Sequence, residues 1–256
     1  MSSKFPAGAV AVFGASGGIG KGVALEFARA GSDVAIFYRS KQDAAEALAT
    51  EVRGLGRRAS IHQADARSYE ALEQGFAAAV AAHTRVHSIV WGAGPIVAQV
   101  NIADWSLEQF RASMEIEAFG FYYAARIAIP HFRAQGGGSF VHLGSAGHDW
   151  WPHLDGLSVA PKACNESLVK GIAKEEGVHE IRANSVLVGV IEAGQLFELQ
   201  RRGQIDQRWV DNTHRLLCLK RFGTAEEIGH ACLFFASDEA AYVTGQRISV
   251  SGGFGV

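Results

Sequence analysis

Short apolar segments alternate with amphipathic segments along most of this chain. Ala9–Phe13 is a run of five apolar residues that ends in glycines, and residues 19–30 carry apolar side chains at helical spacing before Gly31. The same order then repeats, with strands predicted at 34–37, 59–63, 86–91, 139–143, 181–188 and 247–250 and helices at 43–53, 69–82, 107–131 and 157–176. Strands separated by helices of this length require crossover connections. The pattern therefore predicts an α/β fold with a doubly wound sheet of about seven parallel strands.

One segment, residues 193–219, does not follow this alternation. It lies between the last two predicted strands and carries five large apolar residues: Phe197, Leu199, Trp209, Leu216 and Leu217. Long excursions in compact domains are often functional, so it could be a substrate lid, but it could also be a helix pair that packs on the core. With no linker elsewhere, residues 1–256 are predicted to form a single domain.

Composition and charge exclude several classes of protein. The formal net charge is -2 and the basic residues are scattered, which argues against a nucleic-acid partner. No uninterrupted apolar run is long enough for a membrane span, and no leader-like segment opens the chain. The three cysteines lack CxxC spacing, so we expect no metal site and a reducing, cytoplasmic location.

The turn after the first predicted strand is rich in glycine. It reads Gly14-Ala15-Ser16-Gly17-Gly18-Ile19-Gly20 and opens a predicted helix. In this context glycines let backbone N–H groups approach a pyrophosphate, and the helix directs its positive end at the anion. The P-loop pattern GxxxxGK[ST] does not fit this turn. We therefore predict a dinucleotide site rather than a P-loop.

The end of the second predicted strand indicates which dinucleotide is preferred. An acidic residue at this position would bind the ribose 2′-hydroxyl, but the chain has Tyr38-Arg39-Ser40-Lys41. A guanidinium can hold a 2′-phosphate bidentately, whereas a carboxylate would repel it. We predict NADP(H) as the cofactor in preference to NAD(H).

Several motifs, in order along nearly the whole chain, resemble those of the short-chain dehydrogenases/reductases. Gly14–Gly20 resembles the family's TGxxxGIG turn, and the segment from Trp91 to Gly94 resembles its NNAG. Residues 181–186 resemble the family's IRVN segment, and residues 188–191 take the place of its PGxI. Residues 221–227 and 243–246 resemble the family's C-terminal region. The resemblance implies a Rossmann-type fold. The cofactor-binding residues that we predict are Gly14, Ser16, Gly18, Ile19, Gly20, Arg39, Ser40, Asp65, Ala66, Ala93, Gly94, Lys162, Gly189 and Ile191.

The resemblance also implies a catalytic group, from which one member is missing. Ser145 takes the place of the family's catalytic serine and Lys162 that of its lysine, but the tyrosine position, thirteen residues beyond Ser145, holds Ser158. The family's asparagine on the long fourth helix is replaced by Glu117. We predict Ser145, Ser158, Lys162 and Glu117 as the catalytic residues. The family's tyrosine transfers a proton, and an unactivated serine hydroxyl is a far weaker acid than a phenol.

Three substitutes for the missing proton donor remain open. Glu117 could keep a proton if it is buried, although beside Lys162 it could instead be an ion-pair partner. His148 and His153 follow Ser145 and titrate in the useful range, but they could be surface residues. A water molecule held by Ser158 and Lys162 is the third.

Two hypotheses for the function follow. The first is an NADP(H)-dependent oxidoreductase acting on a small carbonyl, alcohol or conjugated substrate in a pocket framed by Ser145, Trp150, Trp151 and residues 193–219. The second is a nucleotide-binding protein without redox activity, a sensor or an inactive partner of a related enzyme. The resemblance further implies a homo-oligomer, a tetramer or a dimer.

Overall fold

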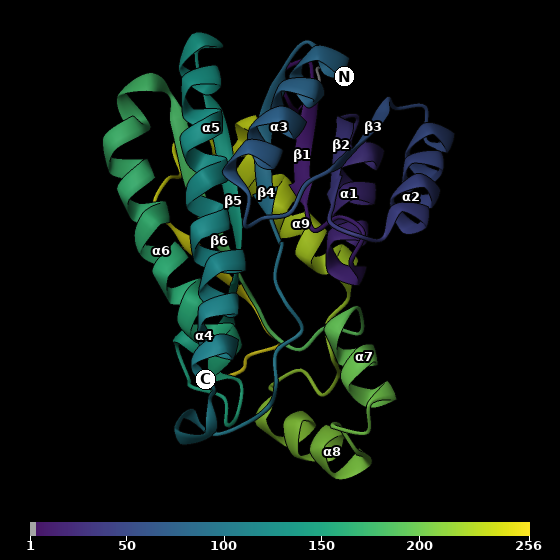
Figure 1. Ribbon diagram of the computed structural model, residues 1–256, viewed down its shortest axis with the longest axis vertical. Helices are drawn as coiled ribbons and strands as arrows, with labels where there is room; N and C mark the ends of the chain where they lie inside the picture. The colour runs from purple at the N-terminus through teal and green to yellow at the C-terminus, as the bar shows by residue number, and fades with distance from the viewer. Residues whose placement is uncertain (1–3) are drawn as a thin grey trace.

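The computed structural model describes residues 4–256, which form one seven-stranded parallel sheet with the strand order β3-β2-β1-β4-β5-β6-β7 (Figure 1). The strands are β1 (Ala9–Phe13), β2 (Asp33–Tyr38), β3 (Ala59–Gln63), β4 (Val86–Trp91), β5 (Gly138–Ser145), β6 (Ile181–Val188) and β7 (Arg247–Val250). Every strand expected from the hydrophobic pattern is present, and the doubly wound α/β prediction is confirmed. The strand order reverses between β1 and β4, where ligands bind in open sheets of this kind.

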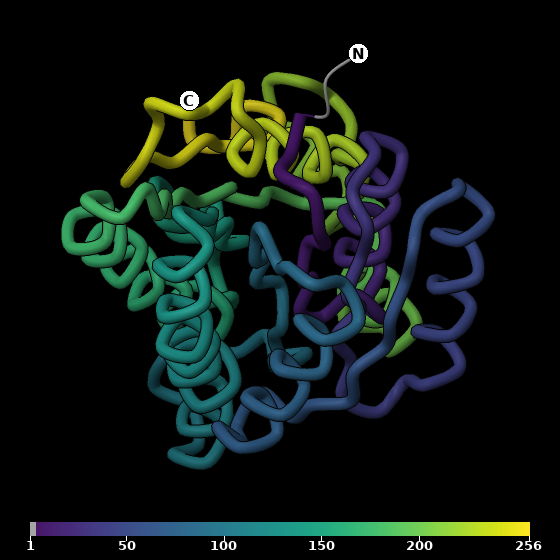
Figure 2. The backbone as a smooth tube through the Cα atoms, turned by 90° about the horizontal axis from the view of Figure 1, so that it is seen from above, coloured from purple at the N-terminus to yellow at the C-terminus, as the bar shows by residue number. Residues whose placement is uncertain are grey.

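Helices cover both faces of the sheet, as the two views in Figures 1 and 2 show. One face is covered by α1 (Gly18–Arg29), α2 (Gln42–Gly54) and α9 (Ala225–Ala236). The other is covered by α3 (Tyr69–His83), α5 (Gly120–Ala134) and α6 (Gly156–Glu176). Alternate residues of β1 supply the two cores: Val10 and Val12 pack on the first face, and Ala11 and Phe13 on the second. Burial on both faces explains why β1 is a continuous apolar run.

The long helix expected at 107–131 contains a change of helical type. It begins as α4 (Leu107–Met114), passes through a five-residue π-helical turn at Glu115–Phe119 and continues as α5. A π-turn adds a residue to one helical turn and so rotates every later side chain about the helix axis. Hydrophobic periodicity does not reveal such a local insertion, and Glu117 lies at its centre.

The excursion at 193–219 forms two short helices, α7 (Gln195–Arg201) and α8 (Gln207–Leu216), beyond the carboxyl edge of the sheet (Figure 1). They enclose a small apolar cluster of their own, which includes Leu196, Leu199 and Leu217 and is completed by Phe222. Phe197 and Leu216 remain exposed. The excursion is therefore a compact appendage rather than an irregular loop.

Short 3₁₀ turns complete the chain at Ile102–Asp104, Ala146–His148, Gly177–His179 and Asp238–Ala240. Within residues 4–256, no helix has the length and apolar character needed to cross a bilayer.

Candidate active site

The predicted cofactor and catalytic residues lie along one edge of the sheet. Because all seven strands are parallel, the residues that follow them emerge on the same side. Gly14 follows β1, Arg39 follows β2, and Ala93 lies two residues beyond β4; Ser145 is the last residue of β5, and Gly189 comes directly after β6. The sheet thus brings together segments that are far apart in the sequence.

The glycine turn has the geometry of an anion cradle. The φ angle of Gly14 is +79°, which disfavours any other residue, and a Cβ on Gly20 would lie 2.3 Å from the Gly14 carbonyl oxygen. The first turn of α1 contains no acidic residue, and no side chain caps it. The backbone N–H groups that begin α1, at Gly18 and Ile19, are therefore available to a phosphate. Ser16 lies in the same turn.

The excursion begins directly against this cradle. A Cβ on Gly18 would lie 2.4 Å from the Gly194 backbone nitrogen, so only glycine allows the two segments to approach so closely. Residues that could close over a bound cofactor thus start at the glycine turn itself.

The side chains at the adenosine end of the predicted site carry mainly positive charge. Arg39 and Ser40 are exposed after β2. Asp65, two residues beyond β3, is hydrogen-bonded by the Arg67 guanidinium, with 2.6 Å between Nη2 and Oδ2. This bond, together with the charges of Arg67 and Arg39, keeps the pKa of Asp65 low. Sequence reasoning singled out Asp65 but not its partner Arg67; the neighbouring Ala66 is buried.

At the nicotinamide end, the backbone is held close to the catalytic group. Gly94 lies so near Glu117 that a Cβ would come within 2.3 Å of a carboxyl oxygen. The Gly189 amide donates to the Val250 carbonyl over 3.1 Å, and Ile191 is buried and pairs with Gly223. Ala93 is half-buried between these segments. At position 189 a Cβ would lie 2.6 Å from the Ser251 Cα, so only glycine fits there, whereas at position 94 the close atom is the end of the Glu117 side chain.

Three of the four predicted catalytic residues contact one another. The Lys162 ammonium donates to the Glu117 carboxylate and lies 3.5 Å from the Ser158 hydroxyl oxygen. Glu117 is almost fully buried, with 5% of its side chain exposed, whereas Lys162 is partly accessible at 18%. The contact expected between Glu117 and Lys162 is thus an ion pair. Ser145 stands apart, and its hydroxyl oxygen accepts from the Gly147 amide at 3.0 Å.

A buried polar chain supports this group from behind. Asn165 donates to the backbone carbonyl of Glu117 over 3.1 Å and lies 3.3 Å from His142 Nε2. His142 is fully buried, and its Nδ1 lies 3.0 Å from Glu166. Burial alone would raise the pKa of Glu166, but the bond with His142 leaves it below its usual value. The chain fixes the π-turn against α6.

The two histidines proposed as proton donors occupy different surroundings. His148 is half-buried with an unpartnered Nε2, and burial lowers its pKa. His153 is exposed. Trp150 and Trp151, predicted to frame the pocket, are each about half exposed, and the Trp150 ring packs 5.0 Å from that of Phe254 near the end of the chain.

Asp155 is a further candidate for the site, and sequence reasoning missed it. It precedes the first residue of α6, and its carboxyl oxygen Oδ1 accepts from the Gln99 side-chain amide over 2.8 Å. Burial raises the pKa of Asp155, whereas the hydrogen bond from Gln99 and the charge of Lys162 lower it. The charge of Glu117 raises it as well, and the net result is a raised pKa. Gln99 comes from the segment between β4 and α4, so only the folded chain joins the two.

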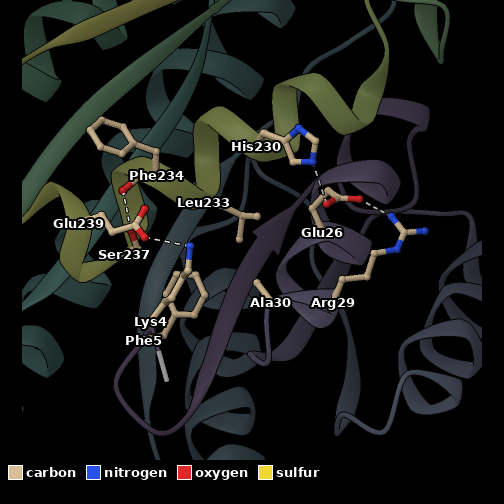
Figure 3. A pocket seen from close by; sticks show the side chains of 10 residues that line it. All are labelled: Lys4, Phe5, Glu26, Arg29, Ala30, His230, Leu233, Phe234, Ser237 and Glu239. Carbon is tan, nitrogen blue, oxygen red and sulfur yellow. Dashed lines mark hydrogen bonds and ion pairs between the residues drawn. The ribbon is translucent and has the colours of Figure 1, made fainter. Parts of the chain in front are cut away.

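Two hollows of the described chain lie at the opposite, amino edge of the sheet. One, of about 460 Å³, lies between the first described residues, α1 and α9; Glu26 there is bonded to Arg29 and His230 (Figure 3). The other, of about 360 Å³, is lined by Arg53, Arg57 and Arg58. Both are remote from the residues above, and their charged groups are largely paired internally. Residues 4–256 contain no group of three or more His, Cys, Asp or Glu side chains that could hold a metal ion.

Comparisons with known proteins agree with this arrangement. The family model described as enoyl-(acyl carrier protein) reductase matches residues 14–255. L-rhamnose 1-dehydrogenase (NAD(P)(+)) of Sphingomonas sp. (strain SKA58) is 32% identical over 95% of this chain and 94% of its own.

Solved structures show the same likeness. A short-chain type dehydrogenase/reductase from Mycobacterium ulcerans superposes with a TM-score of 0.90 at 27% identity, over 97% of this chain and 90% of its own. A 7α-hydroxysteroid dehydrogenase complexed with NADH and 7-oxo glycochenodeoxycholic acid superposes with a TM-score of 0.89 at 26% identity, over 98% of this chain and 96% of its own. The chain therefore belongs to the short-chain dehydrogenase/reductase family. It is an oxidoreductase of the type that acts on alcohols and carbonyl compounds.

Proposed function

We propose that this protein is an NADP(H)-dependent oxidoreductase that interconverts a small alcohol and its carbonyl compound at an atypical site. The observation that carries the proposal is the convergence, on one sheet edge, of the uncapped glycine turn and the Ser158, Lys162 and Glu117 group. When bound, the nicotinamide supplies or accepts the hydride. Arg39 and Ser40 would hold the 2′-phosphate, and Lys162 the nicotinamide ribose.

The chain's own residues divide the remaining tasks. Ser145, at the end of β5, would orient the substrate oxygen. Glu117 holds the Lys162 ammonium in place, and α7 and α8 would act as a lid that excludes water from the reaction. The exposed rings of Trp150 and Trp151 favour an apolar or ring-bearing substrate. We place the protein in the cytoplasm, because Cys164, Cys218 and Cys232 are all free thiols.

The test combines cofactor binding with turnover. We would measure dissociation constants for NADPH and NADH at fixed salt, then NADPH oxidation with cyclohexanone and a 7-oxo bile acid and NADP⁺ reduction with L-rhamnose. Tighter binding of NADPH and steady turnover of at least one probe are expected. Tighter binding of NADH would refute the cofactor preference.

The second candidate is a nucleotide-binding protein without redox activity. Serine at position 158, where the family has its proton-transferring tyrosine, favours it. Tight NADPH binding without turnover of any probe would support this candidate and refute the first.

A further inference from the structure

Two carboxyl groups lie near a single ammonium in this site. Lys162 forms its ion pair with Glu117, and within residues 4–256 no Lys, Arg or His lies within ion-pair distance of Asp155. One carboxylate is therefore neutralised by a cation, and the other is not. Such pairs of carboxyl groups, held in different surroundings, divide the roles of base, counter-ion and acid in many enzymes.

Asp155 lies close in the chain to two other members of the site. Ser158 and Lys162 are four residues apart on α6, and Asp155 is the residue that precedes its first turn. The Ser158 amide donates to the Asp155 carbonyl over 3.0 Å, so the first turn of α6 joins the two residues. Asp155 thus lies three residues before the position of the family's tyrosine, near enough for the charges of Lys162 and Glu117 to act on its carboxyl.

The contacts of Asp155 leave one oxygen unused. Gln99 donates to Oδ1 over 2.8 Å, whereas Oδ2 has no hydrogen-bond partner among the described residues. A partly buried carboxyl with one neutral donor and a free oxygen can carry a proton on that oxygen and present it to a ligand. Ser158 has no comparable acidity.

We propose that Asp155 is the proton donor and acceptor of the reaction, in the role that the family assigns to the missing tyrosine. This inference rests on the proposed oxidoreductase function. In the reducing direction, the carbonyl carbon accepts a hydride from the reduced nicotinamide, which is thereby oxidised. The carbonyl oxygen takes the proton of Asp155 and becomes a hydroxyl, and the resulting carboxylate regains a proton from water. Oxidation of the alcohol follows the same path in reverse.

The surroundings of Asp155 favour its protonated form. Burial raises its pKa, the Gln99 hydrogen bond and the Lys162 charge act in the opposite direction, and the Glu117 charge raises it further. A raised pKa brings a carboxyl closer to the range in which general acids operate. The reduction rate should fall as pH rises through this pKa, because the acid is lost, and the oxidation rate should rise, because the base is formed.

The first experiment is Asp155→Asn, assayed for NADPH-dependent reduction of cyclohexanone and for the reverse reaction with cyclohexanol. We expect kcat to fall about 10²- to 10⁴-fold in both directions with an unchanged dissociation constant for NADPH. The pH dependence of both directions should disappear, and Asp155→Glu should restore part of it. Asp104→Asn, an exposed aspartate on the 3₁₀ turn before α4, is the matched control and should behave as wild type.

The second experiment does not need activity. The infrared difference between wild type and Asp155→Asn isolates the titration of this carboxyl, and the same difference for Asp104→Asn gives the reference. A midpoint for Asp155 above that of Asp104 is expected; an equal or lower midpoint would overturn the proposal. So would an active Asp155→Asn variant with the wild-type pH profile, which leaves the proposed function intact. A wild type that turns over no probe refutes the proposed function instead.

Discussion

At the scale of single residues, the proposal turns on which group near position 158 moves a proton. On the resemblance, a serine there leaves Lys162 without a phenol beside it, and Asp155 is a carboxyl without an ion-pair partner among the described residues. If Asp155 supplies the proton, a tyrosine introduced at 158 should replace it. The two positions are three residues apart, so either could reach the same substrate oxygen.

Ser158→Tyr is therefore expected to rescue Asp155→Asn. A phenol beside Lys162 is a workable acid, so the double variant should regain about 10²- to 10⁴-fold in kcat for cyclohexanone over Asp155→Asn alone. Ser158→Phe in the same background fills the same space without a hydroxyl and should give no rescue. Equal rates for the tyrosine and phenylalanine variants, with both proteins folded and binding NADPH, would contradict the expectation.

We predict, at the same scale, that Arg39 sets the preference for NADP(H). Changing Tyr38 to Asp and Arg39 to Ala removes a cation and adds a carboxylate at the end of β2, so the double variant should prefer NADH. Loss of a bidentate charged contact costs about 1.5 to 3 kcal/mol, or about 10- to 150-fold in the dissociation constant for NADPH. Arg53→Ala, an exposed arginine at the far end of α2, is the control for a general loss of charge. Retained NADPH preference in the double variant would remove Arg39 from the site.

At the scale of elements, the π-turn at Glu115–Phe119 carries Glu117, one of the predicted site residues. Its extra residue turns Glu117 towards α6, where Lys162 binds the carboxylate and Asn165 donates to the Glu117 carbonyl over 3.1 Å. The side chains of Asn165 and His142 behind it are fully buried, so water cannot replace their hydrogen bonds. Helical insertions of this kind occur frequently at functional sites.

The strand β3 carries a buried histidine that makes stability depend on pH. His62 and His83 share the Ser60 hydroxyl, at 2.7 and 2.9 Å. Burial, with a smaller effect from His83, lowers the pKa of His62 to about 4. The unfolded chain binds a proton near pH 6.5 and the folded chain only near 4, so stability is lost as pH falls between these values.

We expect the free energy of unfolding to drop by about 2 kcal/mol between pH 7 and pH 5 on account of His62. Urea denaturation at the two pH values measures this, and His62→Gln should reduce the drop, since glutamine does not titrate. His153→Gln, at an exposed position, should leave it unchanged. An identical drop in wild type and His62→Gln would rule out His62 as the cause.

At the scale of the whole molecule, an apolar surface on the long α4–α5 helix predicts self-association. Leu107 is 86% exposed, and Phe110, Phe119 and Tyr122 on the same helix are each about half exposed. Burying such a surface against a second copy would be favourable. We expect a homo-oligomer, a tetramer or a dimer, in light scattering at micromolar concentration.

Leu107→Asp with Phe110→Asp should lower the measured mass, because a charge at the centre of an apolar interface is left without a partner. Leu55→Asp, an exposed leucine just after α2, is the control and should leave the mass unchanged. A monomeric wild type would contradict the expected oligomer.

The sequence by itself determined the elements and their order. All seven strands, the glycine turn and the helices α1, α2, α3 and α6 were predicted within a few residues, because hydrophobic periodicity and glycine placement act locally along the chain. The helix α9 was not among the predicted helices. The parallel sheet followed from the alternation, and with it the edge on which Gly14, Ser145 and Gly189 emerge.

Only the tertiary structure decided which side chains of the predicted catalytic group pair with one another. Sequence reasoning named Glu117, Ser158 and Lys162, but it left open whether Glu117 would be an acid or an ion-pair partner, and it did not single out Asp155. The reason is that charge balance in the site depends on which side chains from β4–α4, the π-turn and α6 come within a few ångströms of each other. Neither the π-turn nor the bond from Gln99 to Asp155 leaves a periodic trace in the sequence. Burial and pairing, which set the pKa of a carboxyl, exist only once these distant segments have packed together.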